Sequence, residues 1–207
     1  DFNRVRIKKW EAAVSLIYRG RNGAFFQFKP LLESFDVENT TGRFVNGLPA
    51  NSAIFDRQVY GGAEVEYRFI NKDNHAFPTL GLDVGLRTGY KANVGSSNAN
   101  NNFGYLMPHL AIDHRILKNG ALVLATNIRG EAILGQNFEF YHAAVLGGNN
   151  GLRGFRNERF SGKYAFNQNT DLRMLLGSFK TSIIPLQYGV SASFDYGRVW
   201  LANNTSN

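Results

Sequence analysis

Hydrophobic and polar residues alternate along most of this chain with a period of two, as in strands with one apolar and one polar face. The clearest case is 57–70, where Val59 and Val65 share one parity while Glu64 and Arg68 occupy the other. About eight segments repeat the pattern. Their predicted ranges are 9–18, 24–35, 57–70, 78–90, 104–117, 121–134, 170–178 and 186–197. The pattern therefore predicts an all-β chain.

The connections between these segments alternate in length. They are short at 19–23, 71–77, 118–120 and 179–185, and long at 38–56, 91–103 and 135–169. Transmembrane β-barrels have short turns on one side of the membrane, longer loops on the other, and strands that are apolar toward lipid and polar toward the lumen. We therefore predict an antiparallel transmembrane β-barrel. A soluble barrel of lipocalin type would show the same alternation with its apolar face lining a dry core.

The amino-acid composition supports an all-β protein and excludes several kinds of functional site. The 207 residues include 22 glycines, 17 phenylalanines, 9 tyrosines and no cysteine. The lack of cysteine excludes disulfides, cysteine-ligated zinc and thiol catalysis from this chain. The formal net charge is +7, but the basic residues are scattered among the alternating strands. We therefore expect no nucleic-acid partner.

Two further features bear on the membrane. No stretch reaches the roughly 18 apolar residues of a membrane helix, so the strands would have to cross. Aromatic residues near the predicted strand ends suit the interfacial girdles of a barrel. They are Trp10, Tyr18, Phe69, Tyr90, Phe103, Tyr105 and Trp200. The alternation is already under way at the first residues, so we expect the chain to be a piece of a longer protein.

Signals for catalysis are weak. The four histidines lie in no metal-ligand spacing, and neither a nucleophile elbow nor a phosphate loop occurs. They are His75, His109, His114 and His142. We expect no catalytic residue, no metal, no cofactor and no enzyme activity within this chain. Several charged residues instead suit a balanced ionic ladder in a lumen. They are Glu64, Glu66, Asp83, Arg68 and Arg87.

The longest predicted loop, 135–169, carries an arginine between glycine-rich stretches, Arg153 in Leu152-Arg153-Gly154-Phe155. A lone aspartate, Asp195, lies on the last strand in Phe194-Asp195-Tyr196-Gly197. The planar guanidinium can hold a carboxylate with two parallel hydrogen bonds, and flanking glycines allow a close approach to the strand. We therefore predict an ion pair between Arg153 and Asp195. Parity places Asp171 and Arg173 on the same lumenal face as Asp195.

Three motifs together resemble the BamA/TamA superfamily of outer-membrane assembly and translocation barrels, also called the bacterial surface antigen family. They are Leu152-Arg153-Gly154-Phe155 in the longest loop, Asp171-Leu172-Arg173 on the next strand, and Ser193-Phe194-Asp195-Tyr196-Gly197 on the strand after that. The match covers about 121–200 well and the rest only by alternation. Two residues depart from the usual pattern. Asp171 stands where the family usually has glutamate, and Ser193 where it usually has phenylalanine or glycine.

The resemblance implies a barrel of about sixteen strands, of which about eight lie in residues 1–207 as a partial barrel domain. It also implies that the loop 135–169 folds into the lumen. Arg153 would then be held by Asp195, with Asp171 as a second acidic neighbour. A simpler role for Arg153 is only to seal the lumen and fix the loop.

The resemblance further implies insertion, assembly or translocation of proteins at the outer membrane of a Gram-negative bacterium. The implied partners are outer-membrane lipid, client outer-membrane or exported proteins, and accessory lipoproteins. A second hypothesis is a barrel that anchors or exports a fused enzyme domain, patatin-like or phosphoesterase. A third is a small passive porin-like barrel, in which the last strand would pair with the first.

Overall fold

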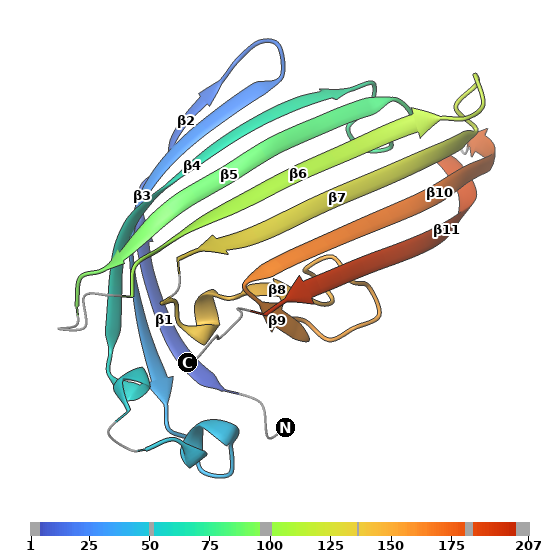
Figure 1. Cartoon of the computed structure of the whole chain (residues 1–207). Coiled ribbons are helices and arrows are strands. Elements are labelled where there is room, and N and C mark those ends of the chain that lie inside the picture. Colours follow the sequence, from blue (N-terminus) through green and yellow to red (C-terminus); the bar gives the residue numbers. More distant parts are fainter. Residues whose placement is uncertain (1–4, 50–51, 96–100, 136, 181–183, 202–207) are drawn as a thin grey trace.

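The computed structural model describes residues 5–49, 52–95, 101–135, 137–180 and 184–201. They form one large, strongly curved antiparallel sheet (Figure 1), with strand order β1-β3-β4-β5-β6-β7-β10-β11 and β2 beside β3. The strands of this sheet are β1 Arg6–Ala13, β2 Leu16–Arg19, β3 Ala24–Glu38, β4 Gln58–Lys72, β5 Gly81–Asn93, β6 Phe103–Arg115, β7 Leu122–Leu134, β10 Tyr164–Lys180 and β11 Pro185–Trp200. The predicted all-β antiparallel fold is confirmed.

The remaining elements lie in the connections. They are the short 3₁₀ helices η1 Phe44–Gly47, η2 Ala53–Phe55 and η3 Phe140–His142, and a small two-stranded sheet of β8 Ala144–Leu146 and β9 Phe160–Gly162. None of the helices in the described part of the chain is long or apolar enough to cross a membrane.

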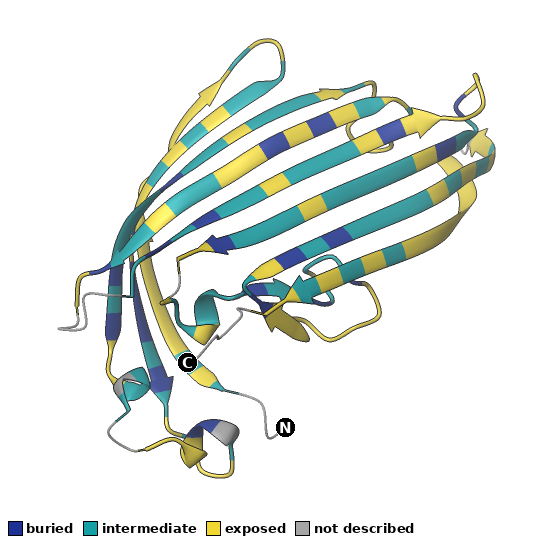
Figure 2. Cartoon of the chain, viewed as in Figure 1, coloured by how far each residue is buried: buried dark blue, intermediate teal, exposed yellow. Residues whose placement is uncertain are grey.

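The two faces of the large sheet differ as the alternation predicted. On β5, Leu82, Val84 and Leu86 are exposed on the outer face, whereas Asp83 on the inner face is only 5% exposed. On β4, Glu64 faces inward and is buried. Figure 2 shows the resulting alternation of exposed and less exposed residues along the strands. An outer face covered with exposed apolar side chains suits hydrocarbon, and the soluble alternative, with its apolar face inward, does not fit.

The connections sort by length onto the two ends of the sheet. One end carries the turns 20–23, 73–80 and 116–121, and the other carries the long connections 39–57, 94–102 and 135–163. Because neighbouring strands are antiparallel, every second connection returns to the same end. We call the end with the long connections the loop end.

The predicted strand 9–18 is interrupted in the structure. β1 ends at Ala13 and β2 begins at Leu16, although both pair with β3 in one continuous register. Val14 donates its backbone N–H to the carbonyl of Pro30 at 3.2 Å. Proline has no N–H to return a hydrogen bond, so the ladder breaks opposite Pro30.

The predicted loop 135–169 is too long. β10 begins at Tyr164, so the loop ends at Lys163. The period of two does not show at this point because Gln168 and Thr170 place polar groups on the outer face as well. Their side chains satisfy one another there, since Gln168 Nε2 donates to Thr170 Oγ1 at 3.2 Å. The other strands differ from their predicted ranges by a few residues at the ends.

The first and last strands of the sheet are its two edges. Within the described residues β1 pairs only with β3, and β11 pairs only with β10. The closure of the last strand onto the first, which a small porin-like barrel requires, is therefore not present in this part of the chain.

A cluster of buried apolar side chains lies on the inner face at the loop end. Its buried members are Phe35, Tyr60, Phe103, Tyr105, Ile133, Ala144, Leu146, Leu152 and Ala165. The prediction that Phe103 and Tyr105 belong to a membrane girdle is wrong, because these residues are 3% and 7% exposed and face inward. Trp10 and Tyr90, in contrast, are each 55% exposed, as girdle residues would be.

Candidate functional site

The longest connection folds onto the inner face of the sheet. After β7 the chain forms η3 and then β8, which pairs with β9 near the end of the connection. Ala144 and Leu146 of β8 are 0% and 3% exposed and share one apolar cluster with residues of the large sheet. Figure 1 shows β8 and β9 lying within the curve of the sheet, beside β10 and β11. We call residues 135–163 the inward loop.

Arg153, between β8 and β9, reaches both aspartates. Its Nε lies 2.9 Å from Oδ2 of Asp195, and its Nη2 lies 2.5 Å from Oδ1 of the same carboxylate. The backbone N–H of Arg153 donates to Asp195 Oδ2 at 3.0 Å. Nη2 also donates to Asp171 Oδ1 at 2.8 Å, so the shorter side chain of aspartate is long enough to make this contact. The two aspartates therefore hold the loop to β10 and β11 together.

Charge and exposure set the strength of this contact. The carboxylates of Asp195 and Asp171 raise the pKa of the Arg153 guanidinium above its usual range. The Arg153 side chain is 48% exposed, that of Asp171 is 33% exposed and that of Asp195 is 13% exposed. Water and salt screen a half-exposed ion pair, so we assign the charge pair only about 1 kcal/mol, with bidentate geometry adding orientation.

The remaining motif residues have different surroundings. Leu152 is 6% exposed and lies over Gly197, where an added Cβ would be 2.9 Å from Leu152 Cδ2. Gly154 has a φ of 87°, and Phe155 is 52% exposed with its ring centroid 5.4 Å from that of Phe160. Phe194 is 64% exposed, with the parity of the outer face. The structure thus brings Leu152, Arg153 and Gly197 together and leaves Phe194 outside the site.

Two asparagines that sequence reasoning assigned to the loop belong to the site instead. Asn169 on β10 donates its Nδ2 to the carbonyl of Gly151 at 2.7 Å, next to the arginine. Asn167 is 4% exposed, and its Nδ2 donates to Asn169 Oδ1 at 2.9 Å. Sequence reasoning missed both residues because they lie in a polar stretch that shows no alternation. The signal that could have found them is their inward parity with Asp171.

The inner face below the loop carries the predicted ionic ladder. Arg68 holds Asp83 through Nε and Nη2 at 2.8 and 2.6 Å, and His109 Nε2 lies 2.9 Å from the same carboxylate. Arg87 donates to Glu66 at 3.0 Å. The attraction within each pair offsets part of the cost of removing these charges from water.

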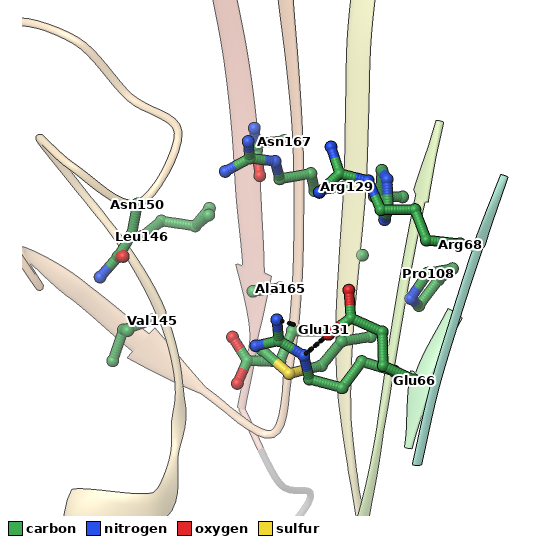
Figure 3. A pocket seen from close by; sticks show the side chains of 14 residues that line it. Glu66, Arg68, Pro108, Arg129, Glu131, Val145, Leu146, Asn150, Ala165 and Asn167 are labelled. Atoms are coloured by element: carbon green, nitrogen blue, oxygen red, sulfur yellow. Dashed lines mark hydrogen bonds and ion pairs between the residues drawn. The ribbon is translucent and has the colours of Figure 1, made fainter. Parts of the chain in front are cut away.

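A cavity of about 420 Å³ separates the inward loop from the wall. Figure 3 shows Val145, Leu146 and Asn150 of the loop on one side and the wall residues Arg129 and Arg68 on the other. Within the described residues Arg129 has no hydrogen-bonding or ion-pair partner, unlike Arg68. The loop therefore contacts the sheet at separate points and does not seal against it along its whole length.

The curved sheet, the apolar outer face and the inward loop define the class of the protein, which is a partial antiparallel transmembrane β-barrel. The chain is similar to the crystal structure of BamA from Haemophilus ducreyi lacking POTRA domains 1–3, with a TM-score of 0.73 and 16% sequence identity. The match covers 95% of this chain and 42% of the BamA chain, so this chain spans less than half of that protein's length. The likeness shows a BamA-like barrel fold.

Comparing the amino-acid sequence with known protein families and proteins identifies no relative of this chain. No protein-family model matches the chain, and no curated protein matches it either. In the described part of the chain, no group of three His, Cys, Asp or Glu side chains is arranged to hold a metal ion.

Proposed function

We propose that this barrel belongs to a protein that inserts, assembles or translocates other proteins at the bacterial outer membrane, and that Arg153 locks its inward loop. The observation that carries the proposal is the arginine held by Asp195 and Asp171 on a BamA-like barrel. The partners would be outer-membrane lipid on the apolar face, client outer-membrane or exported proteins, and accessory lipoproteins.

The geometry suits a loop that moves with two strands. Asp171 lies on β10 and Asp195 on β11, so any shift of that hairpin shifts the loop. A lock made of half-exposed charges can open and close, because water replaces each hydrogen bond at little net cost.

The test is a charge reversal in the full-length protein. Arg153→Glu places a carboxylate beside two others and should reduce the assembly of client proteins at least about tenfold, since like charges in contact repel. Adding Asp195→Arg should restore part of that loss. Arg129→Glu is the matched control, because Arg129 is a lumenal arginine without an ion pair in the described residues.

Barrel folding is followed in the same variants by heat-modifiable mobility on gels. Normal mobility together with normal client assembly in Arg153→Ala would contradict the lock. A folded barrel with an intact lock that assembles no client would contradict the proposed activity alone.

A further inference from the structure

The inward loop touches the sheet at a second place, far from Arg153 along the strand order. Tyr141 of η3 stacks on Phe35 of β3 with ring centroids 4.5 Å apart and planes at 18°. The neighbouring His142 ring lies edge-on to Tyr60 of β4 at 4.7 Å and packs on Phe103 of β6 at 4.5 Å. We call Tyr141 and His142 with these three wall residues the aromatic anchor.

The three wall residues of the anchor are large aromatic side chains on the inner face of the sheet. Phe35, Tyr60 and Phe103 are 6%, 0% and 3% exposed and occupy inward positions, the same face on which Glu64 and Asp83 are buried further along the sheet. Large aromatic side chains facing a polar lumen are unfavourable unless something covers them. Tyr141 and His142 of the inward loop pack on all three rings, and Lys9 of β1 also lies over the Phe35 ring, 5.5 Å from its centroid. These aromatic residues of the sheet are therefore favourable at inward positions because this segment of the loop packs against them.

The two contacts of the loop lie on different parts of the sheet. The anchor joins the loop to β3, β4 and β6, whereas Arg153 joins it to β10 and β11. In the strand order, β7 and the loop's own starting point lie between these two groups. The chain thus leaves β7, crosses to the β3–β4 wall and then returns to β10 and β11.

We propose that Tyr141 and His142 are positioning residues that hold the inward loop against the β3–β4–β6 wall and so place Arg153 on Asp195. The loop then works as a strap with two attachments across the inner face. This inference concerns how the loop is seated and does not depend on which client the protein handles.

The anchor is weaker than an ordinary apolar core. Neither ring nitrogen of His142 has a hydrogen-bonding partner in the described part of the chain, although both are buried. Burial of unpaired polar atoms offsets part of the gain from aromatic contact. The strap can therefore release at this end without unfolding of the barrel.

A buried reporter tests the inference in the full-length protein. Leu146 lies between the two attachments and is 3% exposed, and this chain has no cysteine of its own. Leu146→Cys, in a background without other reactive thiols, reports loop release by its rate of labelling with a water-soluble maleimide. Heat-modifiable mobility shows in parallel that the barrel is folded.

We expect Tyr141→Ala with His142→Ala to increase the labelling rate at least about tenfold in a folded barrel. Phe140→Ala is the matched control, since Phe140 belongs to the same short helix, is 38% exposed and has its ring contact with Tyr141 alone in the described residues. Tyr141→Phe keeps the stacked ring and should label slowly, as the parent does. Equal rates in the double variant and the parent would overturn the proposal.

A second comparison separates positioning from general loosening. If the anchor acts by placing Arg153, its loss should add little to the labelling rate once Arg153→Ala is present. Independent, fully multiplicative effects would overturn the positioning role. Should the double variant fail to fold, Phe35→Leu trims the same contact from the wall side, and a folded Phe35→Leu barrel that labels at the parental rate would also overturn the inference.

Discussion

Leu152 lies directly over Gly197, so close that a Cβ on residue 197 would be 2.9 Å from Leu152 Cδ2 and 3.1 Å from Leu146 Cδ1. Position 197 is therefore a point of close approach between the loop and β11 beside the arginine. A residue with a side chain at this position would push the ends of these leucines aside.

Larger residues at position 197 should lift the loop. Gly197→Ala is expected to cost about 1 kcal/mol of loop seating, because the end of the Leu152 side chain must shift, and Gly197→Val about 2–3 kcal/mol. The labelling rate of Leu146→Cys measures the loss. Gly61→Ala is the control, since a Cβ there has nothing closer than 3.6 Å. A parental rate in Gly197→Val would show that the close approach does not matter.

Lysine should replace Arg153 poorly. A single ammonium cannot make the parallel bonds to Asp195 and also reach Asp171, so Arg153→Lys should lose about as much as Arg153→Ala, about 1 kcal/mol. Added salt should weaken the native lock, because at about 1 M the Debye length falls to about 3 Å. The labelling rate should therefore rise with salt in the parent and stay flat in Arg153→Ala. The idea fails if both respond alike.

Asn169 should contribute more to the seating of the inward loop than its neighbour Gln168. Asn169→Ala removes the donor to the Gly151 carbonyl and should cost about 1 kcal/mol of loop seating. Gln168→Ala removes a side chain that bonds Thr170 on the outer face and should leave the loop unchanged. Chemical denaturation of the folded barrel, followed by heat-modifiable mobility on gels, measures the free-energy cost of each substitution. Equal losses in the two variants would count against a role for Asn169 in the loop.

Acid should loosen the aromatic anchor. Burial first, and then the positive charges of Lys91 and Lys9, lower the pKa of His142 to about 3. The released side chain would take up a proton near its ordinary pKa of about 6.5, so the released state binds more protons at low pH. Loop seating is therefore fully stable above about pH 6.5 and weakens as the pH falls toward about 3, by up to about 2 kcal/mol at pH 5.

The measurement is the labelling rate of Leu146→Cys against pH, corrected for the intrinsic reactivity of the thiol with a model peptide. His142→Phe keeps an aromatic ring without a titrating nitrogen and should remove this part of the pH dependence. An unchanged profile in His142→Phe would assign the acid response to other groups.

The alternation of single residues determined the class of fold. Each strand exposes one face to hydrocarbon and one to a polar interior. Apolar and polar residues therefore alternate along the sequence, as in Leu82, Asp83 and Val84. The antiparallel order followed from the lengths of the connections. The pair of Arg153 and Asp195 was also predictable, because a lone carboxylate at an inward position and a glycine-flanked arginine have few other partners.

Only the tertiary structure decided how the inward loop is seated. Asn167 and Asn169 belong to no apolar pattern, and Phe35, Tyr60 and Phe103 occupy positions where the alternation predicts polar contact. Their roles depend on which distant segment lies against them, and a strand's periodicity records only which face a residue is on. The closest contacts of the loop come from strands many residues away, so the neighbours of Tyr141 and His142 are fixed by the curvature of the sheet and not by any local pattern.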